Sequence, residues 1–325
     1  MEPGFPSAIR VSGLVKSFGA VRAVDGLDLE INEGECFGLL GPNGAGKTTT
    51  IEILEGLQRA DAGSVELLGR SWEKNEVELR ERIGVQLQET QLYDKLSVVE
   101  TLSLFRSFYR HPVPLEEVMS SVDLGEKRND WVGKLSGGQK QRLAVACCLV
   151  ADPQILFLDE PTTGLDPTSR RQLWEILNRI KSKGRTLLLT THYMDEAERL
   201  CDRVAVVDHG KVIALGTPAQ LIGSVGGDQI IELATDPPLL AEDFEGLPGL
   251  VRVSSNGEGA RLTVREIHTA LPALLERARK KAVAVTRLVT RHATLEDVFL
   301  NLTGHRLIEE GNGPEAPKVK RKTRS

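Results

Sequence analysis

Residues 41–48 read Gly41-Pro42-Asn43-Gly44-Ala45-Gly46-Lys47-Thr48, and this stretch decides the fold of the 325-residue chain. Its fixed positions match the phosphate-binding pattern G-x-x-x-x-G-K-[ST]. Glycines let the backbone turn tightly, so that several N–H groups can approach a polyphosphate. Lys47 adds a positive charge for the outer phosphates, and Thr48 adds a hydroxyl for Mg²⁺. An apolar run precedes the loop and a predicted helix over residues 49–57 follows it, which is the setting that this motif requires.

Two further motifs lie between residues 135 and 160. The first is Leu135-Ser136-Gly137-Gly138-Gln139, which opens a predicted helix and can hold a second phosphate on backbone N–H groups. The second is an apolar strand over residues 155–158 that ends in Asp159 and Glu160. Asp159 is placed as a Mg²⁺ ligand, and Glu160 can face the γ-phosphate as the general base. Together the motifs predict ATP hydrolysis.

These motifs resemble those of the ATP-binding subunits of ABC transporters over about residues 8–222. Asp166, in Gly164-Leu165-Asp166, stands where that family has its D-loop, and His192 stands at the place of the switch histidine. Gln88 matches the Q-loop glutamine, with Gln86 as the alternative. The resemblance implies an α/β fold, a P-loop NTPase of ABC type, with an inserted helical arm over about residues 97–151. Alternating strands and helices predict a mainly parallel sheet with helices on both faces.

The resemblance also implies a role for each motif residue. Phe18 would stack on the adenine, where many members have tyrosine, or it would pack in the core. The ATP phosphates would lie against Gly41, Pro42, Asn43, Gly44, Ala45, Gly46, Lys47, Thr48 and Thr49. Mg²⁺ would be held by Thr48, Asp159 and Gln88. Glu160 would be the base and His192 a γ-phosphate contact.

One nucleotide does not need two phosphate cradles from one chain, and the resemblance resolves this by pairing two copies head to tail. The signature Leu135, Ser136, Gly137, Gly138 and Gln139 would then complete the partner copy's site, with Asp166 at the seam. Tyr93 and Leu96 lie where the family docks a membrane-spanning partner, although both also suit a core.

Composition and charge narrow the function. The net charge of −5 gives no general attraction for nucleic acid. The four cysteines form no C-x-x-C pair, so neither a zinc site nor a redox motif is indicated. No stretch approaches the ~18 apolar residues that span a bilayer. Taken with the resemblance to ABC transporters, this implies a peripheral protein on the cytoplasmic face of the membrane. The pore would then lie in a separate permease, of the ABC-2 type that the C-terminal resemblance described next implies.

Residues 223–304 form a predicted accessory α+β domain after the ATP-binding domain of residues 1–222. Its predicted order of β, short helix, β, β, helix, β is close to ferredoxin-like, and Gly226-Gly227 marks the join. Residues 294–300 resemble the ending of ABC-2-type exporter subunits, including antibiotic self-resistance pumps. Leu295, Val298, Phe299 and Leu302 form a stripe that packs on this domain or on the ATPase core. Residues 305–325 are a predicted disordered basic tail.

Other functions fit the sequence less well. A soluble ABC ATPase of DNA repair needs a long coiled coil, which is absent, and translation-factor types carry two cassettes where this chain has one P-loop. A non-catalytic ATP sensor is disfavoured by the presence of Glu160 and His192. An importer ATPase shares every motif, so the exporter-like C-terminal segment alone favours export. The sequence does not name the transported molecule.

Overall fold

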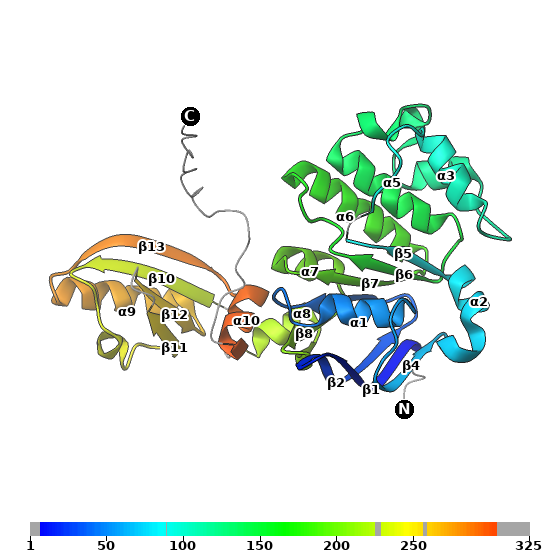
Figure 1. Cartoon of the computed structure of the whole chain (residues 1–325). Helices are drawn as coiled ribbons and strands as arrows, with labels where there is room; N and C mark the ends of the chain where they lie inside the picture. The colour runs from blue at the N-terminus through cyan, green and yellow to red at the C-terminus, as the bar shows by residue number, and fades with distance from the viewer. Residues whose placement is uncertain (1–6, 89, 225–228, 256–258, 304–325) are drawn as a thin grey trace, which may run out of the picture.

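The computed structural model describes residues 7–88, 90–224, 229–255 and 259–303 (Figure 1). The predicted join at Gly226-Gly227 and the predicted tail of residues 305–325 lie outside these ranges. No helix in the described ranges is long and apolar enough to cross a membrane.

A six-stranded sheet with the order β5-β6-β7-β3-β8-β9 forms the centre of the larger part of the chain. All of its pairings are parallel except that of β9 with β8. Every residue of β3, β6 and β7 is buried, as expected for parallel strands covered on both faces. The strands are β3 (Cys36–Leu40), β5 (Ile83–Gln86), β6 (Ile155–Asp159), β7 (Thr186–Thr191), β8 (Arg203–Asp208) and β9 (Lys211–Gly216).

Successive residues of each strand enter different cores. Leu156 and Leu158 of β6 point into a core with α5 (Gly137–Leu149), α6 (Pro167–Ser182) and α7 (Met194–Leu200), whereas Ile155 and Phe157 point into the opposite core. That second core contains α1 (Lys47–Leu54) and a three-stranded antiparallel sheet of the order β2-β1-β4. These strands are β1 (Ser7–Phe18), β2 (Val21–Asn32) and β4 (Ala62–Leu67).

Helices therefore lie on both faces of the central sheet, but on one face α1 is joined by an antiparallel sheet that sequence analysis did not place there. The physical reason lies in the burial pattern of β2, whose second half alternates between buried and exposed residues. Such a strand has one apolar side, so it stacks on another layer and leaves its polar side in water.

The predicted arm contains α3 (Val98–Arg106), α4 (Leu115–Ser121) and α5, with short 3-10 turns at Gly125–Lys127 and Val132–Lys134. A capping box starts α3, because Ser97 and Glu100 exchange hydrogen bonds. Sequence analysis missed α2 (Trp72–Arg82), a polar helix that buries only Leu79 and so lacks a clear apolar stripe. It also missed α8 (Pro218–Gly223).

The C-terminal residues form a four-stranded antiparallel sheet of the order β11-β12-β10-β13, with its own core against α9. Figure 1 shows this sheet as a separate layer, joined to the rest through α10. Its elements are β10 (Gln229–Asp236), a 3-10 turn at Ala241–Phe244, β11 (Leu250–Ser255), β12 (Ala260–Val264), α9 (Ile267–Lys280), β13 (Ala284–His292) and α10 (Leu295–Thr303).

A buried carboxyl group at the end of α1 makes stability depend on pH. Both oxygens of Glu55 are buried without a hydrogen-bond partner, and burial raises the pKa of this carboxyl to about 8. The unfolded chain ionises this group near pH 4.5 whereas the folded chain does so near pH 8. Stability from this group is therefore full below pH 4.5, falls between pH 4.5 and 8, and stays low above.

We predict that Glu55→Gln stabilises the chain more at pH 7 than at pH 4. Its gain in the free energy of unfolding over the wild type should be larger at pH 7 by up to about 3 kcal/mol. Urea titrations of both chains at the two pH values measure this difference. Glu52→Gln, on a partly exposed side of the same helix, is the control and should show no such gain. An equal change at both pH values would show that Glu55 is ionised in the folded chain.

Candidate functional site

The loop between β3 and α1 is built for close approach of a ligand to the backbone. Gly46 has φ of 101° at the start of α1, and a Cβ there would lie 2.2 Å from the carbonyl oxygen of Ala23. A Cβ on Gly41 would lie 2.2 Å from the carbonyl oxygen of Val207. Both positions therefore require glycine. The resulting turn leaves the N–H groups at the start of α1 free to bind an anion.

Lys47 is folded back over its own loop. Its Nζ donates to the carbonyl oxygens of Gly41 at 2.8 Å and Pro42 at 3.0 Å, and the side chain is buried. Burial lowers the pKa of the ammonium, while the charges of Glu160 and Asp159 oppose this. A cation held only by neutral carbonyls and distant carboxylates gains strongly from an added polyphosphate.

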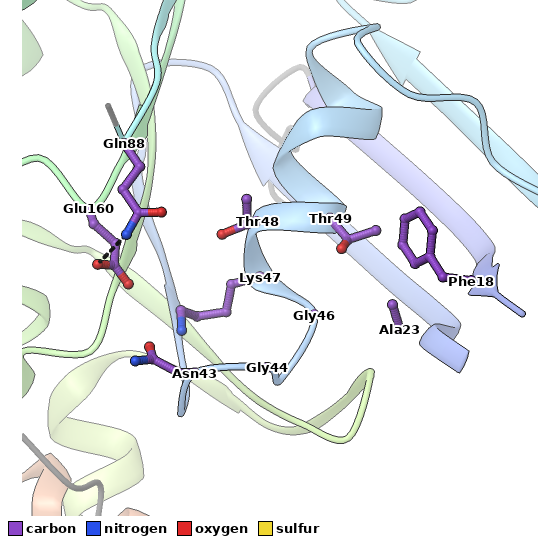
Figure 2. Close-up of a pocket in the computed structure, with 10 residues that line it drawn as sticks. All are labelled: Phe18, Ala23, Asn43, Gly44, Gly46, Lys47, Thr48, Thr49, Gln88 and Glu160. Carbon is purple, nitrogen blue, oxygen red and sulfur yellow. Dashed lines mark hydrogen bonds between the residues drawn. The ribbon is translucent and has the colours of Figure 1, made fainter. Parts of the chain in front are cut away.

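A pocket of about 340 Å³ opens above this loop (Figure 2). Figure 2 shows Phe18 at one end and Gln88 with Glu160 at the other, with the loop between them. The ring of Phe18 is about half exposed at the end of β1, so it is available to stack on a base rather than buried in the core. The pocket is lined by Phe18, Ala23, Asn43, Gly44, Gly46, Lys47, Thr48, Thr49, Gln88 and Glu160.

The carboxylate of Glu160 contacts three neighbouring side chains. Its Oε1 lies 3.2 Å from Nδ1 of His192, and its Oε2 accepts from Thr163 at 3.1 Å and from Gln88 at 3.4 Å. The hydrogen bond from His192 is the main reason that the pKa of Glu160 lies below its usual range. The carboxylate is therefore ionised at neutral pH and oriented from three sides.

Asp159 is held by the neighbouring strand. The hydroxyl of Thr190 on β7 donates to Asp159 Oδ1 and accepts from the backbone N–H of Glu160 at 3.0 Å. Burial raises the pKa of Asp159, and hydrogen bonds from Thr190 and Thr48 together with the charge of Lys47 offset part of that rise. Thr190 thus fixes two successive acids with one hydroxyl group.

The signature residues lie elsewhere on the chain. Ser136 caps α5. Its hydroxyl accepts from the backbone N–H of Gln139 at 3.2 Å, and the side-chain oxygen of Gln139 accepts from the backbone N–H of Ser136. Asp166 caps α6 and also accepts from the hydroxyl of Ser169. A Cβ on Gly138 would lie 2.5 Å from that hydroxyl oxygen, so α5 and α6 approach closely there. None of the signature residues, Leu135, Ser136, Gly137, Gly138 and Gln139, lines the pocket.

The geometry also separates the alternatives that the sequence left open. Gln88 faces Glu160 in the pocket, whereas Gln86 is a buried residue of β5 that does not line it. Tyr93 is about three-quarters exposed, so it is not a core residue, while Leu96 is half-buried. Gly41, Pro42, Ala45, His192, Asp159 and Asp166 do not line the pocket surface, although Lys47 and Glu160 contact several of them.

Sequence analysis missed Thr190, Thr163 and Ala23. A signal for Thr190 was present, because two threonines end an otherwise apolar strand beside the one that ends in Asp159. In parallel strands such ends meet at one edge of the sheet. Thr163 and Ala23 carried no comparable signal.

The chain is similar to known families and to individual proteins along most of its length. Residues 24–163 match the family model described as ABC transporter, and residues 216–303 match the one described as ATP-binding protein DrrA1-3-like, C-terminal domain. The chain is 39% identical to a Nod factor export ATP-binding protein I from Ralstonia nicotianae, covering 94% of this chain and 97% of that one. It is 42% identical to the protein of the same name from Rhizobium sp., covering 92% and 98%.

Solved structures extend the likeness to the fold. One described as the ATP binding subunit of an ABC transporter has a TM-score of 0.61 at 28% identity, covering 67% of this chain and 93% of that one. A dimeric bacterial ABC transporter cassette has a TM-score of 0.58 at 26% identity, covering 64% and 98%.

We predict that Thr190→Val lowers the free energy of unfolding by about 1–3 kcal/mol, because it leaves a buried N–H and a buried carboxylate without their shared hydroxyl. Thr190→Ser keeps the hydroxyl and should restore most of the loss. Chemical denaturation measures both variants. Equal losses for valine and serine would show that the methyl group, and not the hydroxyl, is what matters.

Proposed function

The chain belongs to the ATP-binding subunits of ABC exporters, which couple ATP hydrolysis to transport, and on this premise we propose how its own residues bind and cleave ATP. The observation that carries the proposal is the ionised Glu160, oriented by His192, Thr163 and Gln88 at the end of the pocket opposite Phe18.

In the proposed complex the adenine stacks on Phe18 and the phosphates lie along the loop of residues 41–49. Lys47 exchanges its two carbonyl partners for phosphate oxygens. Glu160 accepts a proton from the water that attacks the γ-phosphate. His192 holds the carboxylate of Glu160 in place before the reaction and contacts the γ-phosphate.

The donor set at the end of β6 fits Mg²⁺. Thr48, Asp159 and Gln88 offer a hydroxyl, a carboxylate and an amide oxygen, and Mg²⁺ prefers oxygen ligands while sharing its shell with phosphates and water. In the described ranges no group of three or more His, Cys, Asp or Glu side chains could hold a metal, so the phosphates would complete the site. When bound, the ion would neutralise charge that develops on the phosphates.

A composite site from two copies explains the position of the signature. Ser136 and the N-terminus of α5 form an anion-binding end that contributes nothing to this chain's own pocket. Pairing head to tail places it on the ATP of the partner copy, with Asp166 at the seam. A similar dimeric cassette supports such pairing.

The direction of transport and the setting follow from the relatives. Both relatives are named as export proteins, and the similarity covers nearly their full length. This favours export over import. We propose a peripheral position on the cytoplasmic face of the membrane, against a separate ABC-2-type permease that Tyr93 helps to dock. The C-terminal domain is proposed to be ferredoxin-like, from its element order and antiparallel sheet. Transport of antibiotics or other drugs stays a prediction of the C-terminal resemblance.

We predict that Glu160→Gln lowers steady-state ATP hydrolysis by about 10²–10⁴-fold, because the amide cannot accept the proton. Binding of a fluorescent ATP analogue should be unchanged, and dimers should accumulate in gel filtration with Mg-ATP. Glu175→Gln, on the exposed side of α6, is the control for an acid lost elsewhere. Hydrolysis above about a tenth of the wild-type rate would remove Glu160 from the role of base.

We predict that the signature acts across a dimer. Lys47→Ala weakens nucleotide binding, since it removes a charge from the outer phosphates, and Ser136→Arg blocks the signature. Each variant alone has two broken sites, but a mixed dimer has one intact site. Mixing the two chains should recover part of the ATPase activity. Absence of recovery in mixed dimers verified by affinity tags would contradict either completion in trans or independent action of the two sites.

A further inference from the structure

One face of the last helix of the C-terminal domain packs in the core of the ATPase domain, whereas Leu302, a predicted member of that face, is exposed. Leu295, Val298 and Phe299 of α10 are at most 1% exposed and belong to the same hydrophobic core as α6, α7 and β7, not to the core beneath the C-terminal sheet. α10 packs on α8 and α7, and Figure 1 shows it between the four-stranded sheet and the rest of the chain. The C-terminal sheet therefore reaches the ATPase core through one helix.

Polar contacts tie α10 to both sides. Towards the ATPase domain, the backbone N–H of Leu295 donates to Oε1 of Glu198 on α7 at 2.7 Å. Towards the C-terminal sheet, Asp297 accepts from Arg291 at 2.7 and 2.9 Å and from Arg261 at 3.3 Å. Asp297 is 5% exposed. A buried carboxylate with two guanidinium partners fixes the geometry of the helix that carries it.

The other end of α7 leads into the nucleotide site. His192 and Tyr193 directly precede the helix, and their rings lie 4.1 Å apart between centroids. Nδ1 of His192 contacts Glu160. The helix α7 has seven residues and is therefore about 10 Å long. Because α7 is this short, we expect a shift at Glu198 to move the residues that precede its first turn.

A second contact holds α7 from the side of α6. Glu196 is fully buried and accepts from the indole N–H of Trp174 at 3.1 Å, while Ala197 and Leu200 are buried in the shared core. Loss of the Glu198 contact therefore leaves the helix packed but free to adjust its position. This separates the role of Glu198 from that of a residue needed for folding.

We propose that Glu198 is a positioning residue: by accepting from the N–H of Leu295, it lets the C-terminal domain set the position of α7 and hence of His192 against Glu160. This inference rests on the proposed function, in which His192 and Glu160 serve hydrolysis. It gives the C-terminal domain a direct influence on the catalytic rate and none on the loop that binds the phosphates.

The test compares Glu198→Ala with Glu198→Gln in the full-length chain. Alanine removes the acceptor, whereas the amide oxygen of glutamine still accepts from the N–H of Leu295. We expect Glu198→Ala to lower kcat about tenfold with KM and the affinity for a fluorescent ATP analogue unchanged. Glu198→Gln should recover at least half of the wild-type kcat, and Glu296→Ala, in the first turn of α10, should match wild type.

A second variant examines the route into the C-terminal sheet. Asp297→Asn removes the charge that pairs with Arg291 and Arg261, and it should lower kcat with unchanged affinity in the same way. An unchanged kcat in Glu198→Ala, equal losses for alanine and glutamine, or a loss of nucleotide affinity would each overturn the proposal. A normal kcat in Asp297→Asn would overturn the link to the sheet. A wild-type chain without ATPase activity would instead refute the proposed function.

Discussion

Burial of the central sheet on both faces is the constraint on which the rest of this structure depends. Because β3, β6 and β7 are covered by helices on one face and by α1 with the antiparallel sheet on the other, polar and charged side chains are confined to the strand ends. The carboxyl ends of parallel strands share one edge. Lys47, Asp159, Glu160 and His192 therefore gather there from segments far apart in the sequence.

The gathered charges balance one another without a ligand. Asp159 and Glu160 are adjacent acids, and each is stabilised differently: Asp159 by the hydroxyl of Thr190, and Glu160 by the imidazole of His192. The ammonium of Lys47 donates to the carbonyl oxygens of its own loop. A polyphosphate would give Lys47 an anionic partner, and a divalent cation would give Asp159 a cationic one, which is why the site suits ATP.

The C-terminal domain combines independence with attachment. Its sheet and α9 enclose a core of their own, yet α10 completes the core of the ATPase domain beside α7. One short helix thus belongs structurally to one domain and by sequence to the other. Such a shared element differs from a flexible linker, because displacing it costs buried apolar contacts on one side and ion pairs on the other.

The sequence by itself determined the phosphate loop, the signature at the start of α5 and the acids at the end of β6, because each depends on residues within a few positions of one another. It did not determine that β1, β2 and β4 form a separate sheet, that Thr190 holds Asp159, or that α10 packs on α7. It assigned Gln88 to the site but left Gln86 as an alternative, which only the structure separates from the pocket. These depend on contacts between segments distant in the chain, and such contacts are decided only when the apolar faces of all elements are buried together.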